Sequence, residues 1–281
     1  MQRPSTLNFR LGLIGYPLTH TLSPKIHAAA LQACGLQGSY LPFTIYPTDK
    51  QGLQAILHRL RTGDLHGLNV TIPHKQTVIE YLDELTPTAQ AIGAVNTLCL
   101  HDGKLTGDNT DAPGFLTDLK RFFEFSAFSL QPSALVLGAG GSARAVVYAL
   151  LTDGWNVTLA ARRLEQAQQL AQSFPNYQLP VTNLTNLSLS TFHLLINTTP
   201  LGMTPDIETS PLPENAVLAP GTIVYDLVYN PRETKLMRQA KAQGCRAVNG
   251  LGMLIEQAAL AFEIWTGCRP PRQTLWNAVE T

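Results

Sequence analysis

The chain has 281 residues, and its 20 lysine and arginine residues balance 20 aspartate and glutamate residues, so the formal net charge is zero. Nucleic acids and anionic membrane surfaces select proteins with a basic surplus, so this balance argues against both kinds of partner. Hydrophobic residues make up 44% of the chain and charged residues 14%. These fractions indicate a sizeable buried core, and the length suits one large domain or two of ordinary size.

The apolar stretches are short. None reaches the ~18 residues that a membrane-spanning helix needs. Near the start, Gly15 and Pro17 interrupt an apolar run that is too short for a secretory signal. We therefore expect a cytoplasmic protein that contacts no membrane.

The four cysteines, Cys34, Cys99, Cys245 and Cys268, are widely spaced and form no CxxC pair. This spacing predicts reduced, packed thiols in a cytosolic protein, with neither a structural disulfide nor a zinc site. The seven histidines include no HExxH motif, so we expect no metal site.

The first 110 residues alternate short apolar runs with helical patterns. The strands expected here are 10–14, 40–45 and 68–72, and the helices are 24–34, 50–61 and 75–84. This alternation predicts a mostly parallel sheet with helices on its faces. Two further strands, 94–100 and 104–108, are separated by Asp102-Gly103, which is typical of a β-hairpin turn.

A second strand–helix series follows a helix and connection expected over 112–130. Its strands are expected at 134–138, 156–160, 193–197 and 222–226, and its helices at 142–152, 164–172 and 232–243. The stretch 173–191 reads as a loop or a short strand, and 252–265 reads as one last, strongly apolar helix. The sequence therefore predicts an α/β protein with two strand–helix series.

A glycine-rich turn joins the strand at 134–138 to the helix at 142–152. Gly138, Gly140 and Ala143 fit the G-x-G-x-x-G/A fingerprint, in which the first glycine permits a tight turn and the second lets the backbone approach a pyrophosphate. The phosphates would lie on free N–H groups at the helix N-terminus. The strand before and the helix after it favour nucleotide binding over a merely tight turn.

The end of the next strand indicates which nucleotide is bound. NAD-binding chains usually place an aspartate or glutamate there for the ribose 2′-hydroxyl, whereas this chain has Arg162 and Arg163. Guanidinium groups suit a 2′-phosphate. The alternative is two solvated arginines that open a helix, but the helix dipole disfavours cations at that end. NADP is therefore the expected cofactor.

Several polar residues in the first half adjoin expected strand ends or helix starts. Ser23-Pro24 suits the start of a helix, so Ser23 alone reads as an N-cap, but with Thr21 it offers two hydroxyls to one carboxylate. Lys75 follows a buried strand, at the edge where parallel sheets bind ligands, and can donate to a developing alkoxide. It also reads as a surface lysine in the first turn of a helix.

Four more polar residues are candidates for the site, and two of them, Asp111 and Gln257, have a second reading. Asn96 and Asp111 lie near strand ends, but composition alone favours Asp111 as the N-cap of a helix that starts at Ala112. Thr71, on the strand before Lys75, is placed to line the same pocket. Gln257 lies in an otherwise apolar helix, where a buried amide must bond either the backbone or a ligand.

Taken together, these stretches resemble the shikimate dehydrogenase family over nearly the whole chain and in the family's order. The matching segments are GYPLTHTLSPKIH, GLNVTIPHK, GAVNTL, GDNTDAPG, LGAGGSAR, NTTPLGM, YDLVYNP and NGLGMLIEQAALAFEIWTG. NVTIPHK and GxNTDxxG together are far more specific than the glycine fingerprint. One departure is Thr21, where the family is expected to have serine.

The resemblance implies two α/β domains flanking a cleft. A substrate-binding catalytic domain would take residues 1–112 and 250–281, and a Rossmann-type NADP-binding domain residues 113–249. It implies reversible reduction of 3-dehydroshikimate to shikimate with NADPH, in aromatic amino-acid biosynthesis. The small-molecule substrate would be the main partner, and the resemblance leaves a homodimer open.

The resemblance also assigns site residues. Lys75 and Asp111 would be the catalytic pair, and the substrate would be held by Thr21, Ser23, Thr71, Asn96, Asp111, Tyr229 and Gln257. The NADP site would be lined by Gly138, Ala139, Gly140, Gly141, Ser142, Ala161, Arg162, Arg163, Leu164, Glu165, Gln166, Leu227 and Gly250. Two alternatives stay open: a quinate/shikimate dehydrogenase with a broader substrate range or NAD use, and a non-catalytic sensor, which would be expected to lack Lys75 or Asp111.

Overall fold

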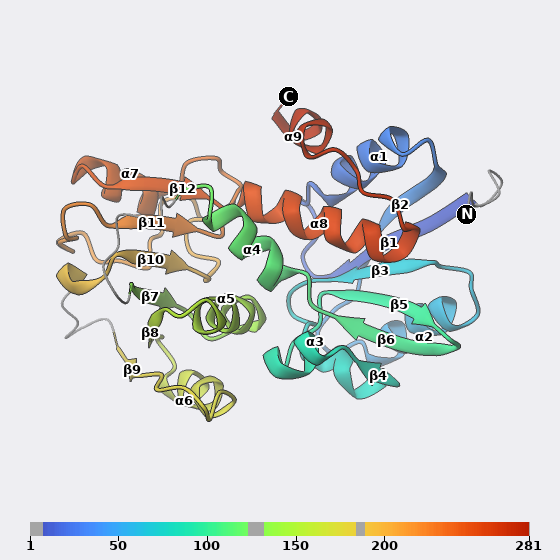
Figure 1. Cartoon of the computed structure of the whole chain (residues 1–281), viewed down its shortest axis with the longest axis horizontal. Helices are drawn as coiled ribbons and strands as arrows, with labels where there is room; N and C mark the ends of the chain where they lie inside the picture. Colours follow the sequence, from blue (N-terminus) through green and yellow to red (C-terminus); the bar gives the residue numbers. More distant parts are fainter. Residues whose placement is uncertain (1–7, 123–131, 184–188, 281) are drawn as a thin grey trace. The chain divides into compact units, whose positions relative to one another are not determined.

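The computed structural model describes residues 8–122, 132–183 and 189–280. The chain forms two compact units: Met1–Gly114 with Leu254–Thr281, and Phe115–Met253. It passes from the first unit to the second within helix α4 (Asp111–Leu119) and returns within helix α8 (Leu251–Thr266) (Figure 1). Residues 123–130, the end of the predicted helix and connection, lie outside the described residues.

The first unit contains a six-stranded sheet with strand order β2-β1-β3-β5-β6-β4. Its strands are β1 (Asn8–Gly15), β2 (Gln37–Thr44), β3 (Gly67–Val70), β4 (Glu84–Leu85), β5 (Thr97–His101) and β6 (Lys104–Asp108). The pairs β1–β2, β1–β3 and β4–β6 are parallel, whereas β5 runs antiparallel to both β3 and β6. The predicted mostly parallel arrangement is thus confirmed around β1, and β5 makes the sheet mixed.

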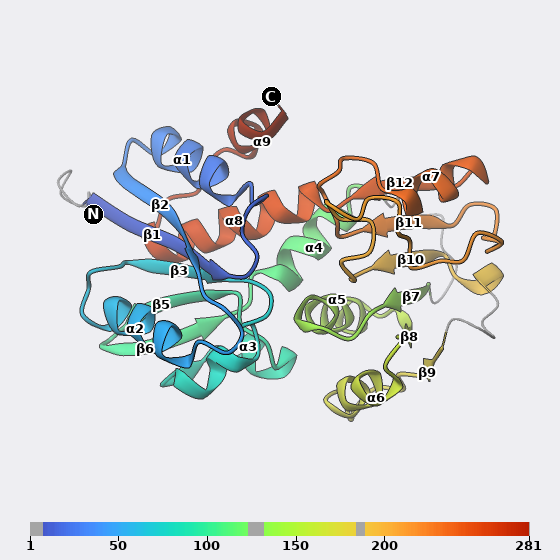
Figure 2. The same ribbon diagram turned by 180° about the vertical axis from the view of Figure 1, so that it is seen from behind.

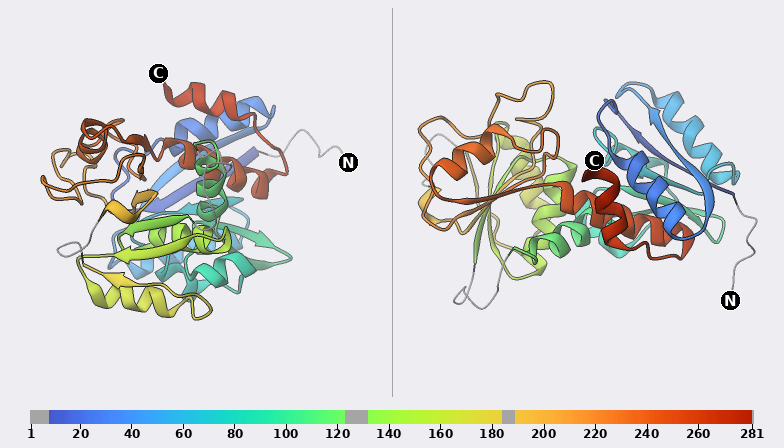
Figure 3. Two further views of the ribbon diagram at one scale, coloured as in Figure 1. Left: turned by 60° about the vertical axis from the view of Figure 1, so that its left-hand side comes forward. Right: turned by 90° about the horizontal axis from the view of Figure 1, so that it is seen from above.

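Helices cover both faces of this first sheet. Helix α2 (Lys50–Arg61) packs its apolar side, including Leu53, Ile56 and Leu60, into a core with strand residues such as Leu68 and Leu98. The other face is covered by α1 (Ser23–Ala33) and α8, with α9 (Arg272–Glu280) beside α1 (Figures 2 and 3). The central strands β1 and β3 are therefore largely buried, whereas most side chains of the edge strand β2 stay exposed.

Two predicted elements of the first unit differ from the structure. Residues 75–84 do not form an α-helix but a short 3₁₀ helix, Thr77–Tyr81, whose end is fixed where Asp83 bonds Arg61 and the Leu105 amide. Strand β5 begins at Thr97 rather than at residue 94, because the Val95 amide donates to the Lys75 carbonyl instead of to a neighbouring strand. The predicted hairpin is confirmed: Asp102 and Gly103 both have positive φ.

The second unit contains a six-stranded, fully parallel sheet with order β12-β11-β10-β7-β8-β9. Its strands are β7 (Ser133–Leu137), β8 (Asn156–Ala160), β9 (Val181–Thr182), β10 (Leu194–Asn197), β11 (Ile223–Asp226) and β12 (Arg246–Asn249). Numbered within this unit, the order is 3-2-1-4-5-6, the order of the doubly wound dinucleotide-binding fold. Helices α5 (Gly141–Thr152) and α7 (Lys235–Ala242) cover opposite faces, and α6 (Leu164–Gln172) packs on β8 and β9 (Figure 3).

The expectation of four reduced thiols is wrong for two of them. Cys34, at the end of α1, and Cys268, in the connection between α8 and α9, form a disulfide with Cα atoms 6.4 Å apart. They are 234 residues apart in the chain, so their spacing could not reveal a contact that the packing of α1 against the C-terminal segment creates. Cys99 and Cys245 are free thiols.

Two kinds of feature are not found in the described part of the chain. None of its helices is long and apolar enough to cross a lipid bilayer. No group of three or more histidine, cysteine, aspartate or glutamate side chains within it is arranged to hold a metal ion.

Candidate active site

The turn that follows β3, residues 71–75, is held in place by backbone hydrogen bonds from three directions. The Thr71 amide donates to the carbonyl of Ile14 in β1 at 2.8 Å, and the Tyr16 amide donates to the Ile72 carbonyl at 2.9 Å. The Lys75 carbonyl accepts from the Val95 amide at 2.7 Å. The backbone of Lys75 is therefore fixed at the carboxyl edge of the sheet.

His74 adds a side-chain anchor to the same turn. Its ring is buried, and Nε2 lies 2.7 Å from the carbonyl oxygen of Ile45, just beyond β2. A carbonyl oxygen only accepts hydrogen bonds, so Nε2 carries the proton. The residue next to Lys75 is thus tied to the strand on the far side of β1.

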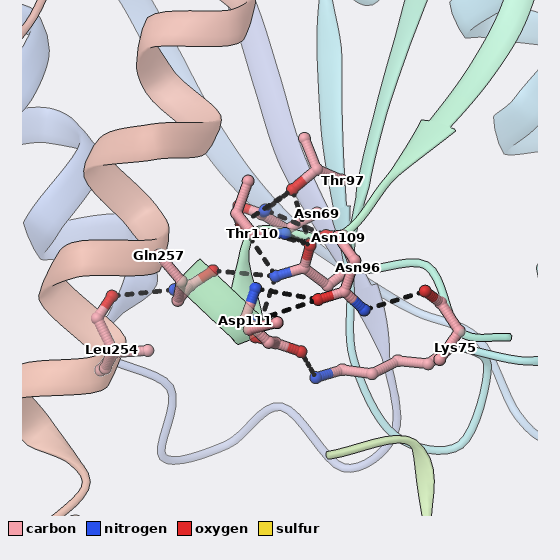
Figure 4. A network of polar contacts seen from close by, with 11 residues as sticks. Asn69, Lys75, Asn96, Thr97, Asn109, Thr110, Asp111, Leu254 and Gln257 are labelled. Carbon is pink, nitrogen blue, oxygen red and sulfur yellow. Dashed lines mark hydrogen bonds and ion pairs between the residues drawn. The ribbon is translucent and has the colours of Figure 1, made fainter. Parts of the chain in front are cut away.

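The Lys75 ammonium reaches the Asp111 carboxylate. Nζ and Oδ2 are 2.5 Å apart, and the two side chains are only 12% and 6% exposed (Figure 4). The reading of Lys75 as a surface lysine in a helix is therefore wrong. An ammonium can donate three hydrogen bonds, so donors remain for a substrate oxygen while the carboxylate holds the charge in place.

Asp111 does not cap α4, contrary to what composition favoured. The helix begins at Asp111 itself, and the Asn109 side chain accepts from the amides of Asp111 and Ala112 at 3.1 and 3.3 Å. Because Asn109 satisfies these helix-end donors, the Asp111 carboxylate is left to bond Lys75 and Asn96. Sequence reasoning missed Asn109, although an asparagine just before a helix is a common cap.

Asn96 joins the polar side chains around the ion pair. Its amide nitrogen lies 2.9 Å from Asp111 Oδ1, 2.9 Å from Thr110 Oγ1 and 3.3 Å from Gln257 Oε1, and its oxygen accepts from the Thr110 amide at 2.7 Å (Figure 4). Below it, Asn69 donates to the Asn96 carbonyl at 3.1 Å. This network fixes the orientation of the carboxylate. Thr110 was not singled out from the sequence, and only its place inside GxNTDxxG marks it.

Gln257 bonds the backbone and also faces the site. Its amide donates to the Leu254 carbonyl at 2.8 Å while its oxygen accepts from Asn96. Helix α8 approaches α4 closely here, since a Cβ added at Gly114 would lie 2.8 Å from the Gln257 backbone nitrogen and 2.9 Å from its Cβ. Gly114, which sequence reasoning also missed, therefore allows α8 to bring Gln257 to the network.

The start of α1 carries Thr21 and Ser23. The N-cap position is Leu22, and no side chain caps from it, so the reading of Ser23 as an N-cap is wrong. Ser23 is the first helical residue, and its amide donates to Thr21 Oγ1 at 3.3 Å. The two hydroxyl-bearing residues therefore flank a helix N-terminus, which favours anions.

His27 lies one turn further along α1 and is fully buried. Its ring stacks on Tyr40 with centroids 4.1 Å apart, and in the described part of the chain neither ring nitrogen has a hydrogen-bond partner. Burial lowers the pKa of His27 from 6.5 to about 3, although the neighbouring Asn69 side chain acts in the opposite direction. The imidazole is therefore neutral in the folded protein.

This neutral histidine predicts acid sensitivity. Between pH 6.5 and 3 the unfolded chain binds a proton at His27 that the folded chain does not, so stability is lost as pH falls. The free energy of unfolding should contain a loss of about 2 kcal/mol from this group between pH 7 and pH 5. Urea unfolding at both pH values should show a correspondingly smaller loss in His27→Phe, and equal losses in both proteins would contradict the assignment.

The second unit contains the predicted cofactor residues. Gly138, directly after β7, has φ of +116°, and a Cβ there would lie 2.5 Å from Thr198 Oγ1 in the loop after β10. Gly140 is the N-cap position of α5, and a Cβ there would meet no protein atom within 4 Å. Open space beside free N–H groups at a helix N-terminus suits a pyrophosphate. The turn lies between β7 and β10, where the strand order reverses and such folds bind dinucleotides.

The remaining predicted cofactor residues lie at neighbouring strand ends of the same sheet. Ala161–Gln166 follow β8, with Arg162 and Arg163 exposed at the start of α6. Leu227 and Tyr229 follow β11, and Gly250 packs so closely that a Cβ there would lie 2.2 Å from the Leu227 carbonyl oxygen. Tyr229, expected to bind the substrate, thus belongs to the second unit, whereas Thr21, Ser23, Thr71, Asn96 and Gln257 belong to the first.

A parallel sheet of dinucleotide-binding order, with a glycine turn at its switch point, and a buried lysine–aspartate pair define the class: a nucleotide-dependent oxidoreductase. Comparison with known proteins is more specific. Residues 13–98 match the family profile described as shikimate dehydrogenase substrate binding domain, 124–207 that of shikimate / quinate 5-dehydrogenase, and 250–280 that of the shikimate 5'-dehydrogenase C-terminal domain.

Individual relatives agree over nearly the full length. The shikimate dehydrogenase (NADP(+)) of Carboxydothermus hydrogenoformans is 42% identical, with 95% of each chain covered. A solved structure of Thermus thermophilus shikimate 5-dehydrogenase with NADP(H) and shikimate superposes with a TM-score of 0.85, at 39% identity over 97% of this chain and 98% of that one. Quinate dehydrogenase from Corynebacterium glutamicum with NAD also has a TM-score of 0.85, at 31% identity over 96% and 98%. The chain therefore belongs to the shikimate dehydrogenase family.

Proposed function

We propose that this protein catalyses the reversible, NADPH-dependent reduction of 3-dehydroshikimate to shikimate, a step of aromatic amino-acid biosynthesis. The observation that carries the proposal is the buried pair of Lys75 Nζ and Asp111 Oδ2, 2.5 Å apart and surrounded by Asn96, Thr110 and Gln257. These groups suit a substrate rich in hydroxyl groups next to a carbonyl. The relatives named for this reaction support the same conclusion.

Lys75 is the group that acts on the substrate oxygen. NADPH, when bound, would supply a hydride to the C3 carbonyl carbon, which would leave negative charge on the carbonyl oxygen. The Lys75 ammonium stabilises that charge and delivers a proton to the oxygen, while Asp111 holds the ammonium in position. In the reverse direction Lys75 accepts the proton of the C3 hydroxyl.

The other predicted contacts orient the substrate around that carbonyl. Thr21 and Ser23, beside the N-terminus of α1, hold the substrate carboxylate. Thr71, Asn96, Tyr229 and Gln257 bind the ring hydroxyls. Such contacts fix the reacting carbon in place, which is where most of the protein's contribution to a cofactor-driven reaction lies.

The cofactor is held by the second unit. Gly138, Ala139, Gly140, Gly141 and Ser142 would hold the pyrophosphate on the N-terminus of α5, and Arg162 and Arg163 would pair with the 2′-phosphate. Ala161, Leu164, Glu165, Gln166, Leu227 and Gly250 complete its lining. The first unit is accordingly the substrate-binding catalytic domain and the second the NADP-binding domain.

The reaction is tested in the forward direction. NADPH mixed with 3-dehydroshikimate and the protein should lose its absorbance at 340 nm, and chromatography should identify shikimate as the product. A protein that leaves NADPH unchanged is not this enzyme. Oxidation of quinate is a second candidate function. Two observations favour it: Thr21 adds a methyl group at the carboxylate site, and a quinate dehydrogenase is among the similar structures.

Gly114→Ala tests whether Gln257 binds the substrate. The added methyl group must push the Gln257 backbone away, so the KM for shikimate should rise by about tenfold while the KM for NADP⁺ stays unchanged. Thr117→Ala, on the exposed side of α4, is the matched control. Unchanged shikimate kinetics in a folded Gly114→Ala variant would contradict the role of Gln257.

A homodimer is the proposed assembly. Strand β2 is an edge of its sheet, and Leu41 on it is 53% exposed, so a second copy could pair with this edge. Light scattering on an eluting size-exclusion peak should give twice the chain mass of 30.6 kDa, and a monomer mass would reject the dimer.

The proposed location is the cytoplasm. The free thiols Cys99 and Cys245 fit a reducing compartment, whereas the Cys34–Cys268 disulfide is unusual there. Cell fractionation combined with thiol trapping during lysis tests the location and the disulfide together. Recovery of the protein outside the cytoplasmic fraction would reject the proposed location.

A further inference from the structure

Asp226, the last residue of β11, is a buried carboxylate that the reaction does not use. It is 0% exposed and accepts three hydrogen bonds. Oδ1 accepts from Asn197 Nδ2 at 2.8 Å and from the Val228 amide at 3.0 Å, and Oδ2 accepts from Thr234 Oγ1 at 2.6 Å. Three donors converge on one carboxylate at the carboxyl edge of the second sheet.

Each donor belongs to a different segment of the cofactor side. Asn197 ends β10, and its own oxygen accepts from the amide and hydroxyl of Thr199 at 2.9 and 2.7 Å, which orders the loop beside the Gly138 turn. Val228 lies between Leu227 and Tyr229. Thr234 caps α7 by accepting from the Met237 amide at 3.3 Å. Asp226 therefore joins two strand-end loops and a helix start.

Burial and hydrogen bonding have opposite effects on the pKa of Asp226. Burial raises the pKa of Asp226 to about 6, and the hydrogen bonds from Thr234, Val228 and Asn197 oppose the rise. These three neighbours, from α7, the strand-end segment and β10, carry no charge. Near neutral pH the ionised carboxylate accepts from all of them, whereas protonation removes one acceptor position, and the Asn197 and Val228 N–H groups can only donate.

We propose that Asp226 is a positioning residue for the cofactor, since its carboxylate sets the loop after β10 and the segment Leu227–Tyr229 in the arrangement that binds NADP. This inference rests on the proposed function, because that function assigns the cofactor to this edge. Protonation of Asp226 loosens the arrangement and weakens NADPH binding below pH 6.

Calorimetric titration with NADPH tests the proposal without using activity. At pH 7.5, Asp226→Asn should raise the Kd by about tenfold, because an amide nitrogen replaces one acceptor. The 2′-phosphate of NADPH titrates in the same range as Asp226, as phosphate monoesters do. The decisive quantity is therefore the ratio of the variant Kd to the wild-type Kd, which should shrink several-fold between pH 7.5 and pH 5.

Thr234 supplies a second pair of variants should Asp226→Asn fail to fold. Thr234→Val removes a donor and should raise the Kd several-fold at pH 7.5, and Thr234→Ser should restore it. A folded Asp226→Asn whose Kd stays within twofold of wild type, a ratio independent of pH, or equal Kd values for the two Thr234 variants would each overturn the proposal.

Failure of the function gives a different pattern. If the Kd ratio of Asp226→Asn to wild type depends on pH but the wild type does not reduce 3-dehydroshikimate, the proposed enzyme is refuted and Asp226 remains a cofactor-positioning residue. If the wild type reduces the substrate but the Kd ratio does not depend on pH, only the role of Asp226 is refuted. Wild type that does not bind NADPH refutes both.

Discussion

Replacement of Lys75 by alanine is expected to lower kcat by about a thousandfold, with little change in the KM for shikimate. Lys75 is the donor assigned to the substrate carbonyl, and Asp111 holds its ammonium from 2.5 Å away. Without the ammonium, negative charge on the oxygen would develop beside the Asp111 carboxylate, with only amide and hydroxyl groups to stabilise it. Steady-state kinetics together with calorimetric binding of shikimate measure the two effects separately.

Two further variants make this result specific. Lys104→Ala, which removes an exposed lysine paired with Glu84 in the same unit, should leave kcat unchanged. Lys75→Arg keeps the charge but hardly releases a proton, so it separates charge stabilisation from proton transfer. Turnover of Lys75→Ala within a few-fold of wild type would remove Lys75 from the mechanism.

Replacement of both Arg162 and Arg163 by alanine is expected to raise the KM for NADPH by about a hundredfold, while the KM for NADH changes only a few-fold. The two arginines stand where NAD-binding proteins usually have an acidic residue, and both are exposed at the start of α6. Only the 2′-phosphate distinguishes the two cofactors, so only NADPH should lose two charge-assisted contacts.

The matched control for this pair is Arg238→Ala. Arg238 is an exposed arginine of the same unit that pairs with Glu208 on the surface, so its loss should affect neither cofactor. Equal increases in the KM values for NADPH and NADH in the double variant would show that the arginines do not recognise the 2′-phosphate.

The sequence predicted most of the fold because the central strands of both sheets are apolar and most of the predicted helices have an apolar face. The elements that the sequence did not predict lie in short or exposed segments. Helix α3 (Pro87–Ile92) was missed although Thr86 caps it, Pro87 starts it and Gly93 ends it in the left-handed conformation. Strand β12 and helix α9 also went unrecognised, and β12 has only partly buried side chains.

The candidate site was predictable in its residue types but not in its contacts. Local rules favoured Asp111 as a helix cap, and only the structure shows that Asn109 takes that place and leaves the carboxylate to Lys75. Gly114 and Thr110 make their contacts with residues that are distant in the chain or lie on another element. No local sequence pattern reveals such contacts. The Cys34–Cys268 disulfide is another such contact.

The central claim is that this protein is an NADP-dependent shikimate dehydrogenase. The most direct test is kcat/KM for the four combinations of shikimate or quinate with NADP⁺ or NAD⁺, followed at 340 nm. Shikimate with NADP⁺ should exceed every other combination by at least about tenfold. A higher kcat/KM for quinate with NAD⁺, or no reduction of either cofactor by shikimate, would contradict the account.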